Sequence, residues 1–184
     1  MAICLNVGCH DIHIQNFINI DLDPAMKPDL LLDATKLPDK FPEGTVDFIY
    51  CGHFLEHLPA PEGVQVCKDF FNILRPYASV VAVVPDADAC TPAMPYQERE
   101  EILLAGGLHK VLMTEGRLRT YFEQAGFQSL YKVSPKDIPH CRFGQVHWQT
   151  AILAIKHPPV IFRPFPTPAG TTEEPLGRLL EEGA

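Results

Sequence analysis

The stretch from Ile3 to Asp21 constrains the fold more than any other part of the chain. Its first five residues are apolar except for Asn6, which is typical of a strand buried on both faces of a parallel sheet. Gly8 ends this run, and a glycine there lets the backbone turn sharply and expose its N–H groups. A second apolar run, residues 17–20, stops at Asp21. Open α/β sheets bind ligands at the carboxyl ends of their strands, so we expect a binding site beside Gly8 and Asp21.

Five further segments have the composition of strands: residues 29–33, 46–51, 79–84, 127–133 and 146–155. Two long helices are indicated between them. The first begins at Pro61, carries apolar residues at helical spacing and ends at Pro76. The second follows Thr114, a good N-cap residue, and stops at Gly126. This alternation predicts an α/β fold with a doubly wound sheet of about seven strands.

The composition is that of a single globular domain, with 184 residues of which 46% are hydrophobic and 21% charged. The formal net charge of −8 argues against a nucleic-acid partner, because phosphate contacts need an excess of Lys and Arg. No apolar run is long enough to span a bilayer, and the N-terminus lacks the pattern of a secretion signal. Six scattered cysteines without CxxC pairs indicate reduced thiols. We therefore expect a cytoplasmic protein with no membrane partner.

The chain is expected to divide into a domain at residues 1–157 and a tail at residues 158–184. Within the domain, residues 87–113 resemble an insertion, where Pro92 and Pro95 precede a short helix ending at Gly106 and Gly107. Loops over a rigid scaffold often carry specificity, so we assign substrate selection to this region. The tail is rich in proline, and its composition fits extended packing, a partner arm or simple disorder.

A series of short motifs occurs in a fixed order along the chain: LNVGC at 5–9, INIDLDP at 18–24, DA at 33–34, LP at 37–38, VDFIYC at 46–51, HFLEHL at 53–58 and LRP at 74–76. With this series the chain resembles the class I S-adenosylmethionine-dependent methyltransferases over about residues 3–155, and more narrowly their small type 11-like domains. The resemblance implies a Rossmann-like sheet with helices on both faces, mostly parallel but with an antiparallel last strand beside the fifth. It also implies methyl transfer from S-adenosylmethionine to a small-molecule or saccharide-like acceptor, with S-adenosylhomocysteine as product.

The resemblance further implies how this cofactor is held. Gly8 and nearby amides would hold its methionine part, Asp21 its ribose hydroxyls, and Asp33 with Ala34 its adenine. The residues expected to contact the cofactor are Asn6, Gly8, Cys9, His10, Asp21, Leu22, Asp33, Ala34, Cys51 and His53. Where an acceptor must lose a proton, a near-neutral histidine is the natural base, and we expect His53 or His109 in that catalytic role.

Three features depart from the resembled pattern. His10 stands where a second glycine is expected, the connection between the first two strands is too short for a full crossover helix, and no helix precedes the first strand. These departures support an alternative function, a catalytically lapsed methyltransferase-like module for binding or assembly. The missing helix would also leave an apolar flank uncovered, and such patches commonly mark partner surfaces, so we expect a homodimer.

The segment from His53 to His57 spells HxxEH, a zinc-protease signature. A zinc hydrolase of that kind needs the motif within a long helix and a further ligand downstream. Here the motif directly follows a strand and is closed by Leu58 and Pro59. We therefore expect no metal site, and zinc hydrolysis through His53, Glu56 and His57 is the third and weakest hypothesis.

Overall fold

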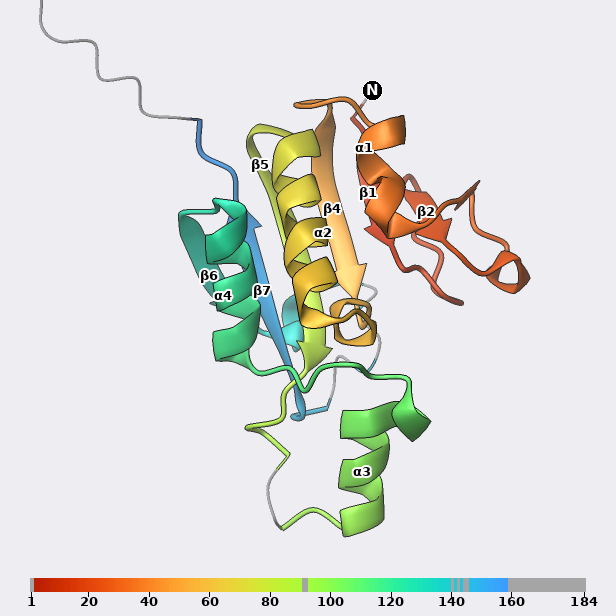
Figure 1. The fold of residues 1–184 in the computed structure, drawn as a ribbon, viewed down its shortest axis with the longest axis vertical. Helices are drawn as coiled ribbons and strands as arrows, with labels where there is room; N and C mark the ends of the chain where they lie inside the picture. Colours follow the sequence, from red (N-terminus) through yellow and green to blue (C-terminus); the bar gives the residue numbers. More distant parts are fainter. Residues whose placement is uncertain (1, 91–92, 140, 142, 144–145, 159–184) are drawn as a thin grey trace, which may run out of the picture.

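Among the residues that the computed structural model describes, which are 2–90, 93–139, 141, 143 and 146–158, seven strands form one sheet (Figure 1). Their order in the sheet is β3-β2-β1-β4-β5-β7-β6. The strands are β1 (Cys4–Val7), β2 (Ile18–Asp21), β3 (Leu30–Leu31), β4 (Val46–Gly52), β5 (Leu74–Pro85), β6 (Ser129–Val133) and β7 (Gln149–Ile155). The expected doubly wound α/β sheet of about seven strands is confirmed.

The first five strands run parallel, β6 runs in the same direction as they do, and β7 alone runs against them. β7 lies between β5 and β6 and pairs antiparallel with both, from Ser79 opposite Ile155 to Pro85 opposite Gln149 on the β5 side. The carboxyl ends of β1, β4 and β5 therefore meet at one edge of the sheet. Gly8, Gly52 and Pro85 lie at these ends, so they can contribute to one shared site.

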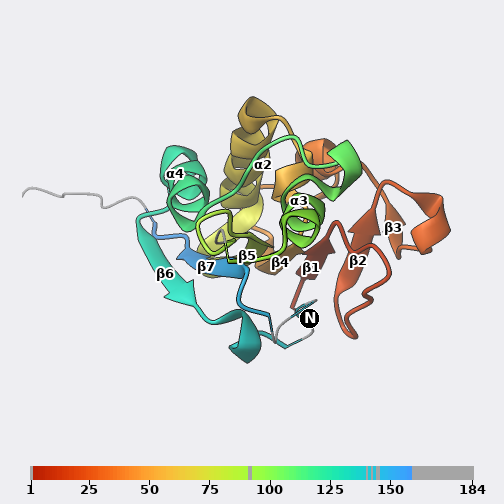
Figure 2. The same cartoon turned by 90° about the horizontal axis from the view of Figure 1, so that it is seen from below.

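In the described part of the chain, four α-helices accompany the sheet: α1 (Leu37–Lys40), α2 (Ala60–Ile73), α3 (Tyr96–Leu104) and α4 (Glu115–Ala125). The same residues include five short 3-10 helices: η1 (Pro24–Met26), η2 (Ala34–Lys36), η3 (Leu55–His57), η4 (Ala105–Gly107) and η5 (Pro135–Asp137). Figure 2 shows α1, α2 and α4 over one face of the sheet, with η5 and the chain connections on the other. α3 lies beyond the ends of β4 and β5, where their arrowheads point (Figure 1).

Each face of the sheet has its own apolar core. The larger core joins the sheet to α2 and α4 through fully buried side chains such as Phe70 and Phe122. The smaller one lies on the opposite face, where Ile14 and Tyr50 pack with Val83. Burying apolar surface on both faces explains why β1, β4 and β5 are almost continuously hydrophobic.

The boundary between α2 and β5 differs from the expected one. The helix ends at Ile73, and β5 begins at Leu74 and not at Ser79 as the sequence indicated. Leu74 pairs with Val46 of β4, so this residue belongs to the sheet although its spacing continues the apolar stripe of the helix. The N-cap at Thr114 is confirmed, since its side chain accepts a hydrogen bond from the Arg117 N–H.

Residues 87–113 contain α3 and η4, which agrees with the short helix expected before Gly106 and Gly107. Apart from Pro158, the predicted tail lies outside the described residues. No helix in the described part of the chain is long and apolar enough to cross a membrane.

Candidate active site

A cavity of about 510 Å³ opens at the carboxyl edge of β1, β4 and β5. α3 and η4 contribute its outer wall. Six predicted site residues line it: Asn6, Gly8, Cys9, His10, His53 and His109. The other lining residues are Ile12, Tyr50, Gly52, His57, Pro85, Glu98, Glu101, Ile102, Ala105, Leu108, Phe143 and Trp148. A cavity of this size is typical of sites that bind small molecules.

The turn after β1 can be built only with glycine at position 8. Gly8 has a φ of 68°, and a Cβ atom added to it would lie 2.7 Å from Cδ2 of Phe54. That distance is shorter than van der Waals contact between carbon atoms allows. The bare backbone therefore faces the cavity, which suits the close approach of a ligand to main-chain N–H groups. Next to it, burial raises the pKa of the Cys9 thiol to about 11, so this side chain is an uncharged part of the wall.

His10 adopts a conformation that favours glycine. Its φ is 47°, a left-handed value that costs a non-glycine residue about 1–3 kcal/mol. The ring turns outward, with Nδ1 2.8 Å from Oδ1 of Asp11 and the side chain 59% exposed. His10 thus keeps the backbone path that a glycine would take, while most of its side chain lies in solvent.

Asp21 links the two strand ends of the site. Its Oδ2 accepts a hydrogen bond from the His10 N–H at 2.8 Å, and its Oδ1 accepts one from the Asp23 N–H at 2.9 Å. A carboxylate can accept about four hydrogen bonds, so two positions stay available to a ligand hydroxyl. The neighbouring Leu22 is 68% exposed. Asp21 therefore holds the β1 turn in place and can still bind.

The remaining predicted cofactor residues lie outside the cavity wall among the residues described. Asp33 caps η2, with Oδ1 accepting from the N–H and the hydroxyl of Thr35, both at 2.9 Å. Ala34 is buried beside it. Cys51 is buried within β4, and burial raises the pKa of its thiol well above the usual value. The roles of Asp33, Ala34 and Cys51 toward the cofactor stay predictions.

A buried amide network that the sequence did not indicate supports the loop after β1. Asn6 Nδ2 donates to the Ile12 carbonyl at 2.8 Å and to Asn19 Oδ1 at 2.9 Å. Asn19 Nδ2 in turn donates to Asp29 Oδ2 at 2.6 Å. Hydrogen bonds from the backbone N–H and the side chain of Asn19 lower the pKa of Asp29. The two asparagines explain how a connection without a helix can be held between parallel strands.

His53 stands at the end of β4 with a φ of 53°, a second left-handed non-glycine residue in the cavity wall. Its Nε2 lies 2.8 Å from Oε1 of Gln149, the first residue of β7. Its Nδ1 lies 3.3 Å from Oε1 of Glu56. The edges of Phe143 and Trp148 pack around the ring, with centroids at 5.6 and 6.0 Å. Strained residues of this kind are common where a side chain must be aimed at a ligand.

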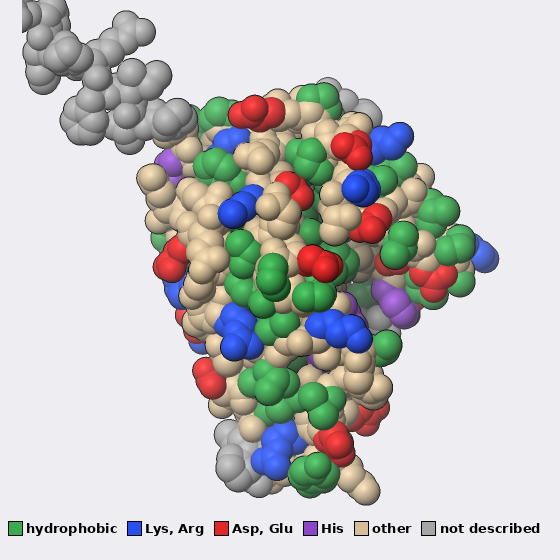
Figure 3. Space-filling model, viewed as in Figure 1, with side chains coloured by type: hydrophobic (Ala, Val, Ile, Leu, Met, Phe, Trp, Pro, Cys, Tyr) green, Lys and Arg blue, Asp and Glu red, His purple; other side chains and the backbone are tan. Residues whose placement is uncertain are grey.

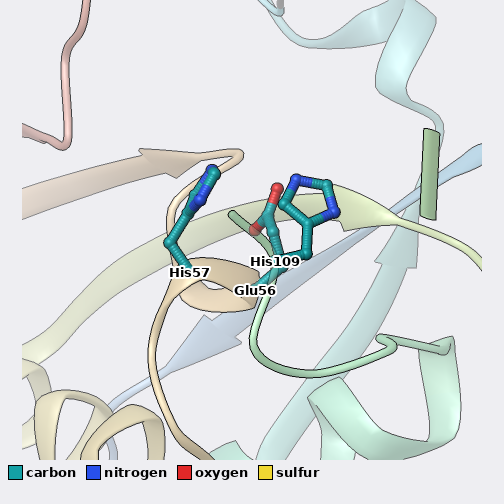
Figure 4. Close-up of side chains that lie close together, drawn as sticks. All are labelled: Glu56, His57 and His109. Atoms are coloured by element: carbon teal, nitrogen blue, oxygen red, sulfur yellow. The ribbon is translucent and has the colours of Figure 1, made fainter. Parts of the chain in front are cut away.

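Glu56, His57 and His109 form a compact cluster at the same end of the cavity (Figure 4). One candidate ligand atom from each lies within 4.8 Å of the others. The Glu56 side chain is 1% exposed, and neither carboxylate oxygen has a hydrogen-bond partner among the described residues.

His109 approaches Glu56 from a different part of the chain. Its Nδ1 lies 3.1 Å from the Leu103 carbonyl, and its ring meets that of His57 edge-on with centroids 4.7 Å apart. Burial lowers the pKa of His109, which keeps the ring neutral at neutral pH. The sequence singled out His109 but gave no signal for its position beside His57, because 87–113 has no periodic pattern.

The HxxEH segment does not form the helix that a zinc protease needs. Only Leu55–His57 is helical within this segment, as one 3-10 turn, and His53 directly follows the end of β4. The expectation that this segment is too short for a zinc-protease helix is confirmed.

The chain is similar to known methyltransferases in part of its sequence and in its fold. Residues 7–82 match the family described as methyltransferase domain. A SAM-dependent methyltransferase from Archaeoglobus fulgidus superposes with a TM-score of 0.62 at 16% identity, covering 84% of this chain and 86% of that one. An S-adenosylmethionine-dependent methyltransferase from Mesorhizobium loti superposes with a TM-score of 0.56 at 15% identity, covering 84% and 90%. One from Thermotoga maritima, described as a possible histamine N-methyltransferase, gives 0.62 at 13% identity, covering 85% and 82%. No curated protein sequence matches the chain significantly.

The sheet order and the glycine turn beside the cavity are those of the class I methyltransferase fold. Residues 7–82 match the methyltransferase-domain family, and the described chain has the fold of the S-adenosylmethionine-dependent methyltransferases named above. These findings support an S-adenosylmethionine-dependent enzyme. The residues present fit that cofactor, because the backbone at Gly8 is bare and faces a cavity large enough for a small molecule.

Proposed function

We propose that the enzyme transfers the methyl group of S-adenosylmethionine to a small-molecule or saccharide-like acceptor. The observation that carries this proposal is the single cavity that extends from Gly8 to His53 and His109. One end offers backbone for the cofactor, and the other offers histidines and the acidic residues Glu98 and Glu101 of α3 for an acceptor. One continuous cavity allows the two substrates to meet in line, and such alignment is the main contribution of an enzyme to methyl transfer.

In this proposal each residue has a defined task. Gly8 and the following amides bind the methionine part, Asp21 the ribose, and Asp33 with Ala34 the adenine. His53 or His109 accepts a proton where the acceptor must lose one. His109 suits this role because its Nδ1 is bonded to the Leu103 carbonyl, which leaves Nε2 as the proton acceptor.

The surface supports a small acceptor over a nucleic acid. On the face of the described chain in Figure 3, acidic and basic side chains are interspersed and form no extended basic area. The net charge of −8 would repel a polyanion. The Thermotoga maritima structure, described as a possible histamine N-methyltransferase, has the same fold and gives one example of a small acceptor.

Isothermal titration calorimetry with S-adenosylmethionine and S-adenosylhomocysteine tests the cofactor part of the proposal. We expect saturable binding of both, together with an increase in Tm. Absence of heat and of thermal stabilisation at millimolar ligand would contradict the function. A screen of small amines, phenols and sugars for production of S-adenosylhomocysteine then identifies the acceptor.

The second candidate is a methyltransferase-like binding module without activity, and the left-handed conformation of His10 is the observation that favours it. Replacing His10 with glycine decides between the two. If His10→Gly creates or sharply raises cofactor affinity, the histidine obstructs the parent site. If the parent protein already binds the cofactor tightly, the hypothesis of an inactive binding module loses its main support.

We also propose that the protein is a cytoplasmic homodimer. Cys4, Cys9, Cys51, Cys67 and Cys90 are free thiols in the structure, which fits a reducing compartment. Leu22 and Leu31 are 68% and 56% exposed near the β3 edge of the sheet, where an apolar partner surface would cover them. Light scattering across a wide concentration range tests this, and a monomer at all concentrations would exclude the dimer.

A further inference from the structure

The buried carboxylate of Glu56 lacks the partners that such a group needs. It is 1% exposed, and both its oxygens are without a hydrogen bond among the described residues. Burying a carboxylate in this way is costly unless a cation or several donors compensate its charge. Ring nitrogens of His53, His57 and His109 lie near this carboxylate. This environment is suited to a bound cation.

The hydrogen bonds of two histidines leave nitrogen lone pairs near Glu56. A carbonyl oxygen can only accept, so the bond from His109 to the Leu103 carbonyl places the proton on Nδ1 and the lone pair on Nε2. Gln149 donates through Nε2 to the Phe143 carbonyl, which leaves its Oε1 to accept from Nε2 of His53. Nδ1 of His53 then faces the Glu56 carboxylate at 3.3 Å. Two acceptors at that distance need a proton or a metal ion near both.

This arrangement is the usual one for histidines that bind metals. A metal-bound histidine donates its other ring N–H to a carbonyl or amide oxygen, which fixes the tautomer and the orientation of the ring. His109 has such a bond to Leu103, and His53 has one to Gln149. Ligand atoms on a metal with bonds of about 2.0–2.2 Å lie up to about 4 Å apart, so the 4.8 Å spread of the cluster needs only a small side-chain adjustment.

The backbone holds the cluster together before any ion binds. The N–H groups of Lys110 and Val111 both donate to the Glu56 carbonyl, at 2.8 and 3.3 Å. This contact ties the segment that carries His109 to the 3-10 turn that carries Glu56 and His57. A preformed set of ligands binds a metal more tightly than one that must be assembled.

We propose that Glu56, His57 and His109 bind a divalent transition-metal ion at the acceptor end of the cavity, with Nδ1 of His53 in reach as a fourth ligand. Two or three imidazoles with one carboxylate suit zinc, iron or manganese, whereas magnesium and calcium prefer oxygen ligands alone. His57 and His109 line the cavity, so an open position on the ion would face the acceptor. The role toward the acceptor rests on the proposed function, but metal binding itself does not.

An ion there would bind an acceptor hydroxyl and lower its pKa, so that the hydroxyl loses its proton to solvent water and the oxygen attacks as an alkoxide. With the ion bound, Nε2 of His109 is a metal ligand, and the ion takes the place of a histidine base. The oxygen–carbon bond forms as the carbon–sulfur bond of the sulfonium breaks, and the neutral thioether of S-adenosylhomocysteine leaves. The acceptor class that this site selects is therefore a small molecule with a hydroxyl group that can coordinate a metal.

Titration with cobalt(II) tests the site directly. Protein without a histidine tag is first treated with a chelator and then titrated with Co²⁺, while visible absorption reports the ligand field. We expect one ion per chain, displaced by Zn²⁺. His57→Ala and His109→Ala should each weaken Co²⁺ binding at least tenfold. The matched control is His157→Ala, because His157 bonds Ser129 at the opposite edge of the sheet and should leave binding unchanged.

Further measurements keep this proposal separate from the proposed function. Glu56 is fully buried, so Glu56→Gln can disturb the fold, and circular dichroism must check that this variant is folded. His109 is more exposed, so the effect of His109→Ala on Co²⁺ binding decides whether the site exists. If the parent binds S-adenosylhomocysteine but no Co²⁺, or if the His57 and His109 variants bind Co²⁺ as the parent does, the metal site is refuted and the methyltransferase proposal stands. Stoichiometric Co²⁺ that the variants lose, without any binding of S-adenosylhomocysteine, establishes the site and refutes the function.

Discussion

At the turn after β1, the Phe54 ring already fills the space that a side chain at position 8 would occupy. We therefore predict that Gly8→Ala lowers the free energy of unfolding by about 1–3 kcal/mol and weakens cofactor binding at least tenfold. Gly44→Ala is the matched control, because Gly44 has a similar φ of 70° with no atom within 4 Å of an added Cβ. Urea unfolding and calorimetry measure both effects. Equal losses of stability in the two variants would mean that the Phe54 contact contributes nothing.

Asp21 is predicted to act on ground-state binding and not on the chemical step. Its carboxylate holds the N–H groups of His10 and Asp23, and a ribose hydroxyl would be a further partner. A hydrogen bond to a charged group contributes about 1.5–3 kcal/mol, so Asp21→Ala should weaken cofactor affinity roughly ten- to a hundredfold. The rate at saturating cofactor should change less. If Asp21→Ala leaves both the cofactor affinity and the circular dichroism spectrum unchanged, Asp21 does not bind the ribose, and Asp23 is the next candidate for that role.

The roles of single residues could be predicted from the sequence where they depend on the local backbone conformation. Gly8 and Asp21 follow from the strand pattern, because a glycine turn and a terminal carboxylate are properties of local sequence. Glu56 could not be interpreted in the same way, since its environment is set by His109, a residue far along the chain. Its burial without a partner becomes visible only in three dimensions.

An ion-pair network centred on Glu115 links α4 to β6. Glu115 lies 2.6 Å from Lys132 of β6 and 3.0 Å from Arg119 of its own helix. Hydrogen bonds from Lys132 and then from Arg119 lower the pKa of Glu115 below its ordinary value of 4.5. The stability that this network contributes is therefore complete above pH 4.5 and is lost as the pH falls through the lowered pKa.

Glu115→Gln should reduce the free energy of unfolding at pH 7 by up to about 1 kcal/mol, because the network is partly exposed. Parent and variant should converge as the pH falls from 4.5 through the lowered pKa of Glu115, where this carboxylate becomes protonated. Urea unfolding across this range checks the trend. Glu123→Gln serves as the control, since Glu123 lies on the same helix without an ion pair among the described residues. A difference that persists unchanged in acid would refute the electrostatic explanation.

Elements could be predicted well where periodicity and end signals agree. Thr114 and Gly126 bound α4 as expected, because a capping hydroxyl and a left-handed glycine act locally. The start of β5 was misplaced because Leu74 continues the apolar spacing of α2, while Pro76 suggested a helix end. Leu74 belongs to β5 because it pairs with Val46 of β4. Such pairing across a sheet cannot be predicted from the spacing of apolar residues along the chain.

Across the whole molecule, the position of β7 makes the sheet dependent on its last strand. β7 pairs with β5 from Gln149 to Ile155, and with β6 over a shorter register. We predict that a chain ending at residue 147 has no cooperative thermal transition, because two strands lose their partner. Adding a peptide of residues 148–158 should restore part of the transition. A truncated chain that unfolds cooperatively would show that the parallel half is stable alone.

The same strand order has a consequence for biosynthesis. β5 leaves the ribosome well before β7, which fills its open side at positions 149–155. At about 5–20 residues per second, the interval from Pro85 to Gln149 lasts roughly 3–13 s. During that time the apolar edge of β5 is available to any passing strand, so the nascent chain depends on chaperones or on rapid elongation to avoid wrong pairing.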